Sequence, residues 1–239
     1  MSWDGLDAPA LAALVGVPRL ELTDSVSSTL DLAHELAAKG AAAGTIILSD
    51  AQSAGRGRQG RTWASPPGRG IWLSVILRPA APPAGGALAV RVGLACVDAL
   101  RAVHPGLAPR LKWPNDVLVL DRKAGGILCE ARWASGRLAW VAVGVGINVH
   151  GPVPADVRDR AIALDDVVHG LSRLGVLTAL VPRLAVLGRA DATLTEAERA
   201  AFLESAWVPP GETVVALEPD GALLVRQGGG VLERRVDPG

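Results

Sequence analysis

Residues 111–149 decide the expected fold, and they read LKWPNDVLVLDRKAGGILCEARWASGRLAWVAVGVGINV. Apolar residues dominate 117–120, 127–133 and 138–149, and short polar or glycine-containing breaks separate these three runs. Runs of this length between turn residues are typical of antiparallel hairpins. The stretch therefore predicts a largely antiparallel sheet.

The flanking sequence adds helices to this sheet and predicts an α+β fold, in which helices flank a mixed sheet. Further buried strands are expected at 45–49 and 71–77, and helices at 30–38 and 88–103. Residues 156–206 return to helical character. Glycine turns then separate short strand candidates, which lie at 213–217, 222–226 and 231–236.

Composition limits the class of protein. The chain has 239 residues, of which 49% are hydrophobic and 20% are charged, and its net charge is zero. Zero net charge argues against a general nucleic-acid binder, which normally carries a basic excess. No basic, apolar signal segment and no run of about eighteen apolar residues is visible. We therefore expect a cytoplasmic protein without a membrane span.

The two cysteines, Cys96 and Cys129, lie in apolar segments without a CxxC pattern. Buried free thiols in a reducing compartment are the expected state. The histidines also lack metal-ligand spacing, so we assign no protein metal site.

Residues 52–61 form a glycine-arginine loop with the sequence QSAGRGRQGR. Its glycines allow backbone N–H groups to approach an anion, and its arginines can bind phosphate or carboxylate oxygens. The chain has only three lysines, and two of them, Lys112 and Lys123, fall within 112–126. The two segments together predict one polyanion-binding site, although a solvated basic loop explains the arginine run alone equally well. The Walker pattern is absent.

A register can be proposed for the hairpin that contains Lys123. If Asp121-Arg122 forms a two-residue turn, Lys123 faces Leu120 and lies about 13 Å from Asp116 along one face, at roughly 3.3 Å per residue. That separation is too long for a salt bridge, and Gly125 would leave a depression between the two charges. A ligand spanning both is one interpretation; a surface hairpin with two unrelated charges is the other.

Other polar residues have two explanations each. Ser28 and Thr29 precede an expected helix and could cap it or bind a ligand. Asn148 ends an apolar run and could close a strand or contact a ligand ring. Trp63 and Trp113 could wall a pocket or pack in the core.

Taken together, five segments resemble the biotin protein ligases. They are Ser27-Ser28-Thr29, Gln52-x-x-Gly55-Arg56-Gly57-Arg58-x-Gly60-Arg61, Lys112-Trp113-Pro114-Asn115-Asp116, Lys123-x-Gly125-Gly126-Ile127-Leu128 and Gly144-x-Gly146-Ile147-Asn148. Their order and spacing also fit, over about residues 20–190. The resemblance implies an enzyme that activates biotin with ATP and attaches it to a carrier lysine. It also implies a fold related to class II aminoacyl-tRNA synthetases, with a small C-terminal β-barrel.

The resemblance also implies roles for individual residues, with ATP and biotin as substrates and Mg²⁺ on the triphosphate. The implied catalytic residues are Lys123, Arg56, Arg58 and Asp116. The implied biotin-binding residues are Ser28, Thr29, Gln52, Gly55, Arg56, Gly57, Arg58, Lys123, Gly125 and Gly126. The implied ATP-binding residues are Arg58, Arg61, Lys112, Asn115, Lys123 and Asn148.

The same resemblance implies partners and domains. The expected acceptor is the biotin carboxyl carrier protein of a biotin-dependent carboxylase, and a homodimer is possible. Residues 1–190 would form the catalytic domain, 191–206 a helical linker and 207–239 a shortened β unit. Residues 1–18 form only an extension, too short for a helix-turn-helix, so no DNA binding is expected. Leu30 departs from the family, which usually has a polar residue there.

Two rival functions remain. A lipoate or octanoate protein ligase shares the general fold, although its usual signature is not visible and Gln52 with the Ser-Thr pair suits a polar ureido ring better. A non-enzymatic nucleic-acid-binding domain could use the arginine loop, but zero net charge and scarce lysine speak against it.

Overall fold

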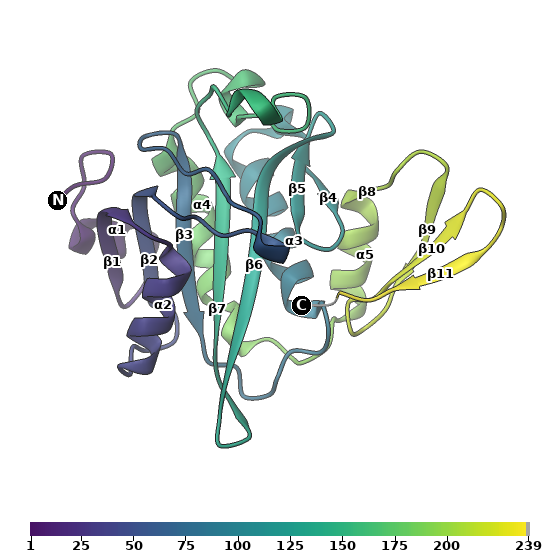
Figure 1. Cartoon of the computed structure of the whole chain (residues 1–239), viewed down its shortest axis with the longest axis horizontal. Helices are drawn as coiled ribbons and strands as arrows, with labels where there is room; N and C mark the ends of the chain where they lie inside the picture. Colours follow the sequence, from purple (N-terminus) through teal and green to yellow (C-terminus); the bar gives the residue numbers. More distant parts are fainter. Residues whose placement is uncertain (238–239) are drawn as a thin grey trace.

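An eight-stranded mixed sheet is the largest element of the computed structural model, which describes residues 1–237 (Figure 1). Neighbouring strands run antiparallel except for the pairs β1–β2 and β4–β8. In spatial order the strands are β1 (Leu20–Val26), β2 (Ile46–Gln52), β3 (Gly70–Leu77), β7 (Arg137–Asn148), β6 (Arg122–Ala134), β5 (Asp116–Val119), β4 (Arg110–Lys112) and β8 (Ala206–Trp207).

The strands predicted from residues 45–49, 71–77 and 111–149 are confirmed as β2, β3 and β5 to β7. Three strands were missed. The edge strand β1 has the mixed sequence LELTDSV, and β4 and β8 have only 3 and 2 residues, too few to show a period.

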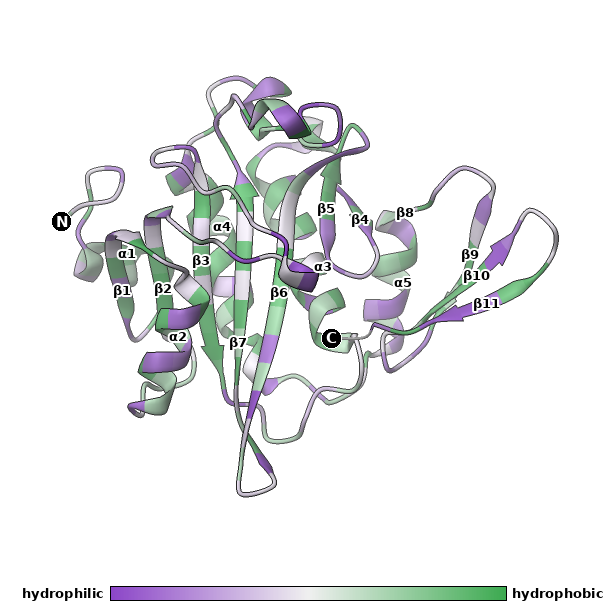
Figure 2. Cartoon of the chain, viewed as in Figure 1, coloured by the Kyte–Doolittle hydropathy of each residue, from purple (hydrophilic) through white to green (hydrophobic). Residues whose placement is uncertain are grey.

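Most helices cover one face of the sheet. The long helix α3 (Ala87–Val103) contacts α4 (Arg173–Ala185) and α5 (Glu196–Ser205), and α1 (Ala8–Val15) contacts α4. The helix α2 (Thr29–Ala38) packs instead on β2, β3 and β7 from the other face, with its own small core around Ala33 and Ile47. Figure 2 shows largely apolar colouring on β3 and β7 and polar bands on α2. The helices predicted at 30–38 and 88–103 are confirmed.

Between 156 and 206 the helical prediction holds only for α4 and α5. The chain before α4 contains short 3₁₀ turns, at Ala155–Val157 and Leu164–Asp166.

The alternation of side chains along β7 makes its two faces different. Val141, Val143 and Val145 lie in the main core beneath α3 and α4. The residues that alternate with them include Gly144 and Gly146. On the α2 side, a Cβ atom at Gly144 would meet Leu30 and one at Gly146 would meet Trp63. Because successive residues of a strand point to opposite faces, these glycines leave a hollow on the α2 side of the sheet.

The predicted register of the β5–β6 hairpin was wrong. The turn is Leu120-Asp121, whose φ angles of 48° and 59° suit a tight hairpin turn. Lys123 therefore pairs with Leu118, and a bulge follows before Val117 pairs with Gly125. Burial of Val117 in the main core fixes this register, since a slip of one residue would turn it to the other face.

The C-terminal strand candidates are confirmed as a separate three-stranded antiparallel sheet, which lies at the opposite end of the molecule from β1 (Figure 1). Its strands are β9 (Glu212–Leu217), β10 (Leu223–Gln227) and β11 (Leu232–Arg235). Across residues 1–237, no helix has both the length and the apolar character that a membrane span requires.

Candidate active site

A narrow recess with a cavity volume of about 50 Å³ opens on the α2 side of the large sheet, beneath the glycine-arginine loop. Arg56 and Lys123 both line it, as the polyanion-site hypothesis required. Of the residues implied by the resemblance, those that line the recess are Ser28, Thr29, Gln52, Arg56, Gly57, Arg58, Asn115, Lys123 and Gly126.

The indole of Trp63 forms one wall of the recess. A Cβ atom at Gly146 would lie 2.5 Å from Trp63 Nε1, and one at Gly126 would lie 2.8 Å from Trp63 Cζ3. The ring also packs edge-on against Trp72, with centroids 6.5 Å apart. Glycine at 126 and 146 is therefore what allows an indole to lie across these strands. The Trp63 Nε1–H is buried and finds no partner in residues 1–237.

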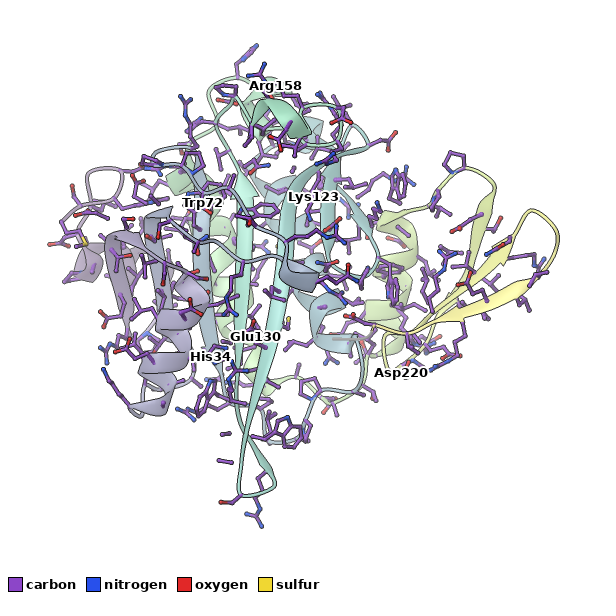
Figure 3. The ribbon with its side chains drawn as sticks, in the orientation of Figure 1. His34, Trp72, Lys123, Glu130, Arg158 and Asp220 are labelled. Carbon is purple, nitrogen blue, oxygen red and sulfur yellow. The ribbon has the colours of Figure 1, made fainter. Side chains whose placement is uncertain are left out.

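Lys123 and Asp116 are in direct contact, with Nζ and Oδ1 2.6 Å apart (Lys123 is labelled in Figure 3). The predicted separation of about 13 Å was wrong because Lys123 pairs with Leu118, two residues from Asp116, rather than with Leu120. Gly125 was also misplaced, since a Cβ atom there would meet core residue Val117 at 3.4 Å. Gly126, beneath Trp63 and Lys123, is the glycine of this pair that lines the recess.

A chain of hydrogen bonds holds Thr29 and Gln52 in place. The backbone N–H and the hydroxyl of Thr29 both donate to Gln52 Oε1, at 2.8 and 3.2 Å. Gln52 Nε2 donates to Ser65, and Ser74 donates to Thr29. Ser28 is the N-cap residue of α2, but its side chain makes no capping bond. Capping therefore does not account for the Ser28 hydroxyl, which lies at the recess.

The arginines of the loop do not all point the same way. Arg56 binds Glu130 and Asp31, and Arg58 binds Asp237 near the C-terminus. Arg61 is exposed, and among the described residues its guanidinium donates only to Gln59. The three carboxylates that hold Arg56 and Arg58 could not be found from sequence, because none of them belongs to a recognisable motif.

Several residues implied by the resemblance lie outside the recess. Lys112 is exposed, with its ammonium 5.2 Å from the Trp207 ring centre. Asn148 donates to the Ile162 carbonyl at 3.3 Å, which closes the end of the strand. The others outside it are Gly55, Arg61, Asp116 and Gly125.

Trp113 does not wall the recess either. It packs against the core and donates to the Gly221 carbonyl. Cys96 and Cys129 are free thiols, as expected, and burial raises the pKa of each to about 12.

Comparison with known proteins places this recess in a family. A model described as the biotin/lipoate A/B protein ligase family matches residues 22–148, which include α2, the glycine-arginine loop and the hairpin of Lys123. The chain belongs to this family. The family span ends at Asn148, so it includes every residue that lines the recess.

Relatives within the family carry ligase names. The bifunctional ligase/repressor BirA of Bacillus spizizenii is 39% identical over 159 residues, which cover 64% of this chain and 49% of that protein. The biotin–[acetyl-CoA-carboxylase] ligase of Mycobacterium tuberculosis is 39% identical over 145 residues, covering 59% and 52%. The chain thus spans about half the length of the curated relatives it matches.

Solved structures confirm the expected fold. The biotin protein ligase of Aquifex aeolicus, in complex with biotin and ATP, aligns with a TM-score of 0.74 and 26% identity, covering 91% of this chain and 95% of that one. The Leishmania major biotin protein ligase shares the fold at 23% identity, with a TM-score of 0.63.

Proposed function

We propose that this chain is an ATP-dependent biotin protein ligase. It would join biotin to AMP and then transfer the biotinyl group to a lysine of a biotin carboxyl carrier protein. The observation that carries the proposal is the convergence of Arg56, Arg58 and Lys123 on one recess that also holds Ser28, Thr29 and Gln52. Membership of the family and the names of the relatives support it.

The first half-reaction would bring two anions together. A carboxylate oxygen of biotin attacks the α-phosphorus of ATP, the bond to the bridging oxygen breaks, and pyrophosphate leaves. At 4 Å and an effective dielectric constant of 20, the repulsion of two unit charges is about 4 kcal/mol. Arg56, Arg58 and Lys123 would offset this repulsion and stabilise the charge that develops on the phosphoryl oxygens. Lys123 is already oriented by Asp116 and Trp63.

The polar end of biotin would bind at the base of α2. Thr29 and Gln52 are fixed by their mutual hydrogen bonds, so little conformational freedom remains to be lost on binding. The Ser28 hydroxyl and the second N–H of the Gln52 amide are left to bind the ureido group. Gly57 and Gly126 would let Arg61 and Trp63 pack closely at the recess, while Gly55 and Gly125 would act through packing of the loop and the sheet.

For the nucleotide, the recess supports direct roles for Arg58, Asn115 and Lys123. Arg61, Lys112 and Asn148 would contact ATP only where it extends beyond the recess or where the loop moves. Across residues 1–237 no group of three or more His, Cys, Asp or Glu side chains could hold a metal ion. We therefore assign Mg²⁺ to the triphosphate, as part of the substrate.

In the second half-reaction a neutral lysine amine of the carrier attacks the acyl carbon, AMP leaves and an amide forms. The amine proton must go to a base, and Asp116 is the proposed acceptor. Because it also contacts Lys123, its first role would be to orient that lysine.

The test is incubation of the chain with labelled biotin, MgATP and a biotin carboxyl carrier domain. Covalent labelling of the carrier, dependent on ATP, is expected. No transfer to a carrier that another biotin ligase does label would reject the proposal. Thermal-shift measurements then compare biotin with lipoate, and stabilisation by lipoate alone would favour the alternative ligase.

A further inference from the structure

Arg56 is held by a carboxylate that is itself the end of a hydrogen-bonded chain. Trp140 Nε1, on β7, donates to His34 Nδ1 on α2 at 2.9 Å. His34 Nε2 lies 2.7 Å from Glu130 Oε2 on β6, and Figure 3 labels His34 and Glu130 side by side. Glu130 in turn binds both terminal nitrogens of Arg56, at 2.9 and 3.1 Å.

The tryptophan determines where the proton of His34 lies. An indole N–H can only donate, so His34 Nδ1 must accept and the proton of the neutral ring must be on Nε2. That proton points to Glu130, which stays free to accept from Arg56. Each member of the chain thus fixes the donor or acceptor role of the next.

The hydrogen bonds between His34 and Glu130 and between Arg56 and Glu130 are strengthened by their limited exposure to solvent. The His34 and Glu130 side chains are only 12% and 18% exposed, whereas Asp31, the other partner of Arg56, is 52% exposed. Ion pairs with little exposure to solvent are screened less than exposed ones. Glu130 is therefore the stronger of the two holds on Arg56.

The contact between Arg56 and Glu130 joins the glycine-arginine loop to β6. A second hollow lies between residues 54–62 of the loop and residues 128–130 of β6, and both Arg56 and Glu130 line it. The Arg56–Glu130 contact bridges that hollow. Arg56 also lines the recess, and its Nε–H is buried without a partner in residues 1–237.

We propose that Glu130 is a positioning residue for Arg56, and that His34, with its tautomer set by Trp140, keeps Glu130 in place. Glu130 and Asp31 accept from the terminal nitrogens of the guanidinium, which leaves its remaining N–H groups, the Nε–H among them, for an anionic ligand. The inference rests on the proposed function, because it deepens the role of Arg56 in the ligase reaction.

The kinetic test uses Glu130→Gln, His34→Phe and His34→Gln, with pyrophosphate release as the assay. A charge-assisted hydrogen bond contributes enough for about a tenfold change. We expect Glu130→Gln and His34→Phe to raise the KM for biotin about tenfold. Tm should be nearly unchanged in Glu130→Gln and lower in His34→Phe, which leaves the Trp140 Nε1–H without its acceptor. His34→Gln, whose amide can still donate toward Glu130, should recover most of the loss. A purely structural role would instead lower Tm and leave the KM of the folded protein unchanged.

The matched control is Arg132→Gln. Arg132 is the other arginine near Glu130, at 3.7 Å with a half-exposed side chain, and its loss should leave KM unchanged. An Arg56→Lys background keeps the positive charge but removes the paired N–H groups of the guanidinium. In that background Glu130→Gln should change the KM for biotin less than about twofold. Undiminished effects in that background would overturn the inference and leave the ligase function intact.

A second test needs no activity. Trypsin cleaves after arginine, so the rate of cleavage in residues 56–61 measures how firmly the loop is held. We expect Glu130→Gln and His34→Phe to be cleaved several-fold faster there than the unmodified chain and Arg132→Gln. Equal rates would overturn the positioning role, whether or not the chain proves to be a biotin ligase.

Discussion

Lys123 and Asp116 form a salt bridge of 2.6 Å at the edge of the recess, between two adjacent strands of the large sheet. The same ammonium lies 5.1 Å from the centre of the Trp63 ring. One carboxylate and one aromatic face thus fix a cation on a β-strand, a more rigid support than the loop that carries the arginines.

Lys123→Met should abolish most adenylate formation. The change removes the ammonium but keeps an unbranched side chain against Trp63, so the expected result is pyrophosphate release slowed about a hundredfold or more. Because the salt bridge is partly exposed, Tm should fall only modestly. Lys39→Met is the control, since Lys39 is exposed and its ammonium bonds only Glu35 within residues 1–237. Pyrophosphate release at the original rate would remove Lys123 from the mechanism.

Gly146→Ala should displace Trp63 and narrow the recess. The new methyl group would lie 2.5 Å from Trp63 Nε1, closer than any stable contact, so the indole has to move. Biotin affinity, measured by calorimetry, should fall about tenfold or more. Gly229→Ala is the matched control, because a Cβ atom there meets nothing within 4 Å. Equal affinities in the two variants would show that Trp63 does not wall the binding site.

Asp237→Asn should make nucleotide binding easier. Asp237 binds Arg58, and both side chains are largely buried, at 8% and 13% exposure. A phosphate that uses Arg58 must therefore displace an internal carboxylate first. The KM for ATP should fall several-fold in the variant. Glu218→Gln, which removes an exposed ion pair with Arg234 in the C-terminal sheet, should not change it. A raised KM for ATP would instead assign Asp237 a supporting role.

The Arg91–Glu198 pair between α3 and α5 should make stability depend on acid pH. Burial alone would raise the pKa of Glu198, but hydrogen bonds from Arg91 and Thr195 outweigh it and lower the pKa below the ordinary value of 4.5. A carboxyl group with a lowered pKa in the folded state stabilises the fold above the unfolded-state pKa. That contribution is lost as pH falls through the folded-state pKa.

Urea unfolding between pH 7 and pH 3 measures this effect. The free energy of unfolding should fall more steeply below about pH 4.5 in the original chain than in Glu198→Gln. Identical slopes would show that the pair contributes nothing to the acid sensitivity. Arg91→Met should be more damaging at pH 7, because Arg91 is only 4% exposed and its loss leaves Glu198 without its charged partner.

Local patterns were enough to predict much of the fold. Short apolar runs between turn residues predicted β2, β3, β6 and β7, and the glycine-separated runs after residue 211 predicted the C-terminal sheet. These elements could be predicted because a buried strand requires apolar residues that lie close together in the sequence. The register of the Lys123 hairpin could not, because a Leu120-Asp121 turn at positive φ and the bulge that follows depend on the packing of Val117 in the core.

The sequence by itself determined the chemical inventory of this protein: a glycine-arginine loop, a lysine hairpin and a Ser-Thr helix start, in an order that resembles one family. Only the tertiary structure decided which of these side chains share a recess, and which carboxylates hold them. Glu130 and Asp237 meet the loop arginines, and His34 meets Glu130, across separations of many residues and through contacts that leave no local pattern in the chain. The physical reason is that hydrophobic periodicity reports which face of an element is buried, whereas ion pairs and hydrogen bonds depend on which elements the folded sheet brings together.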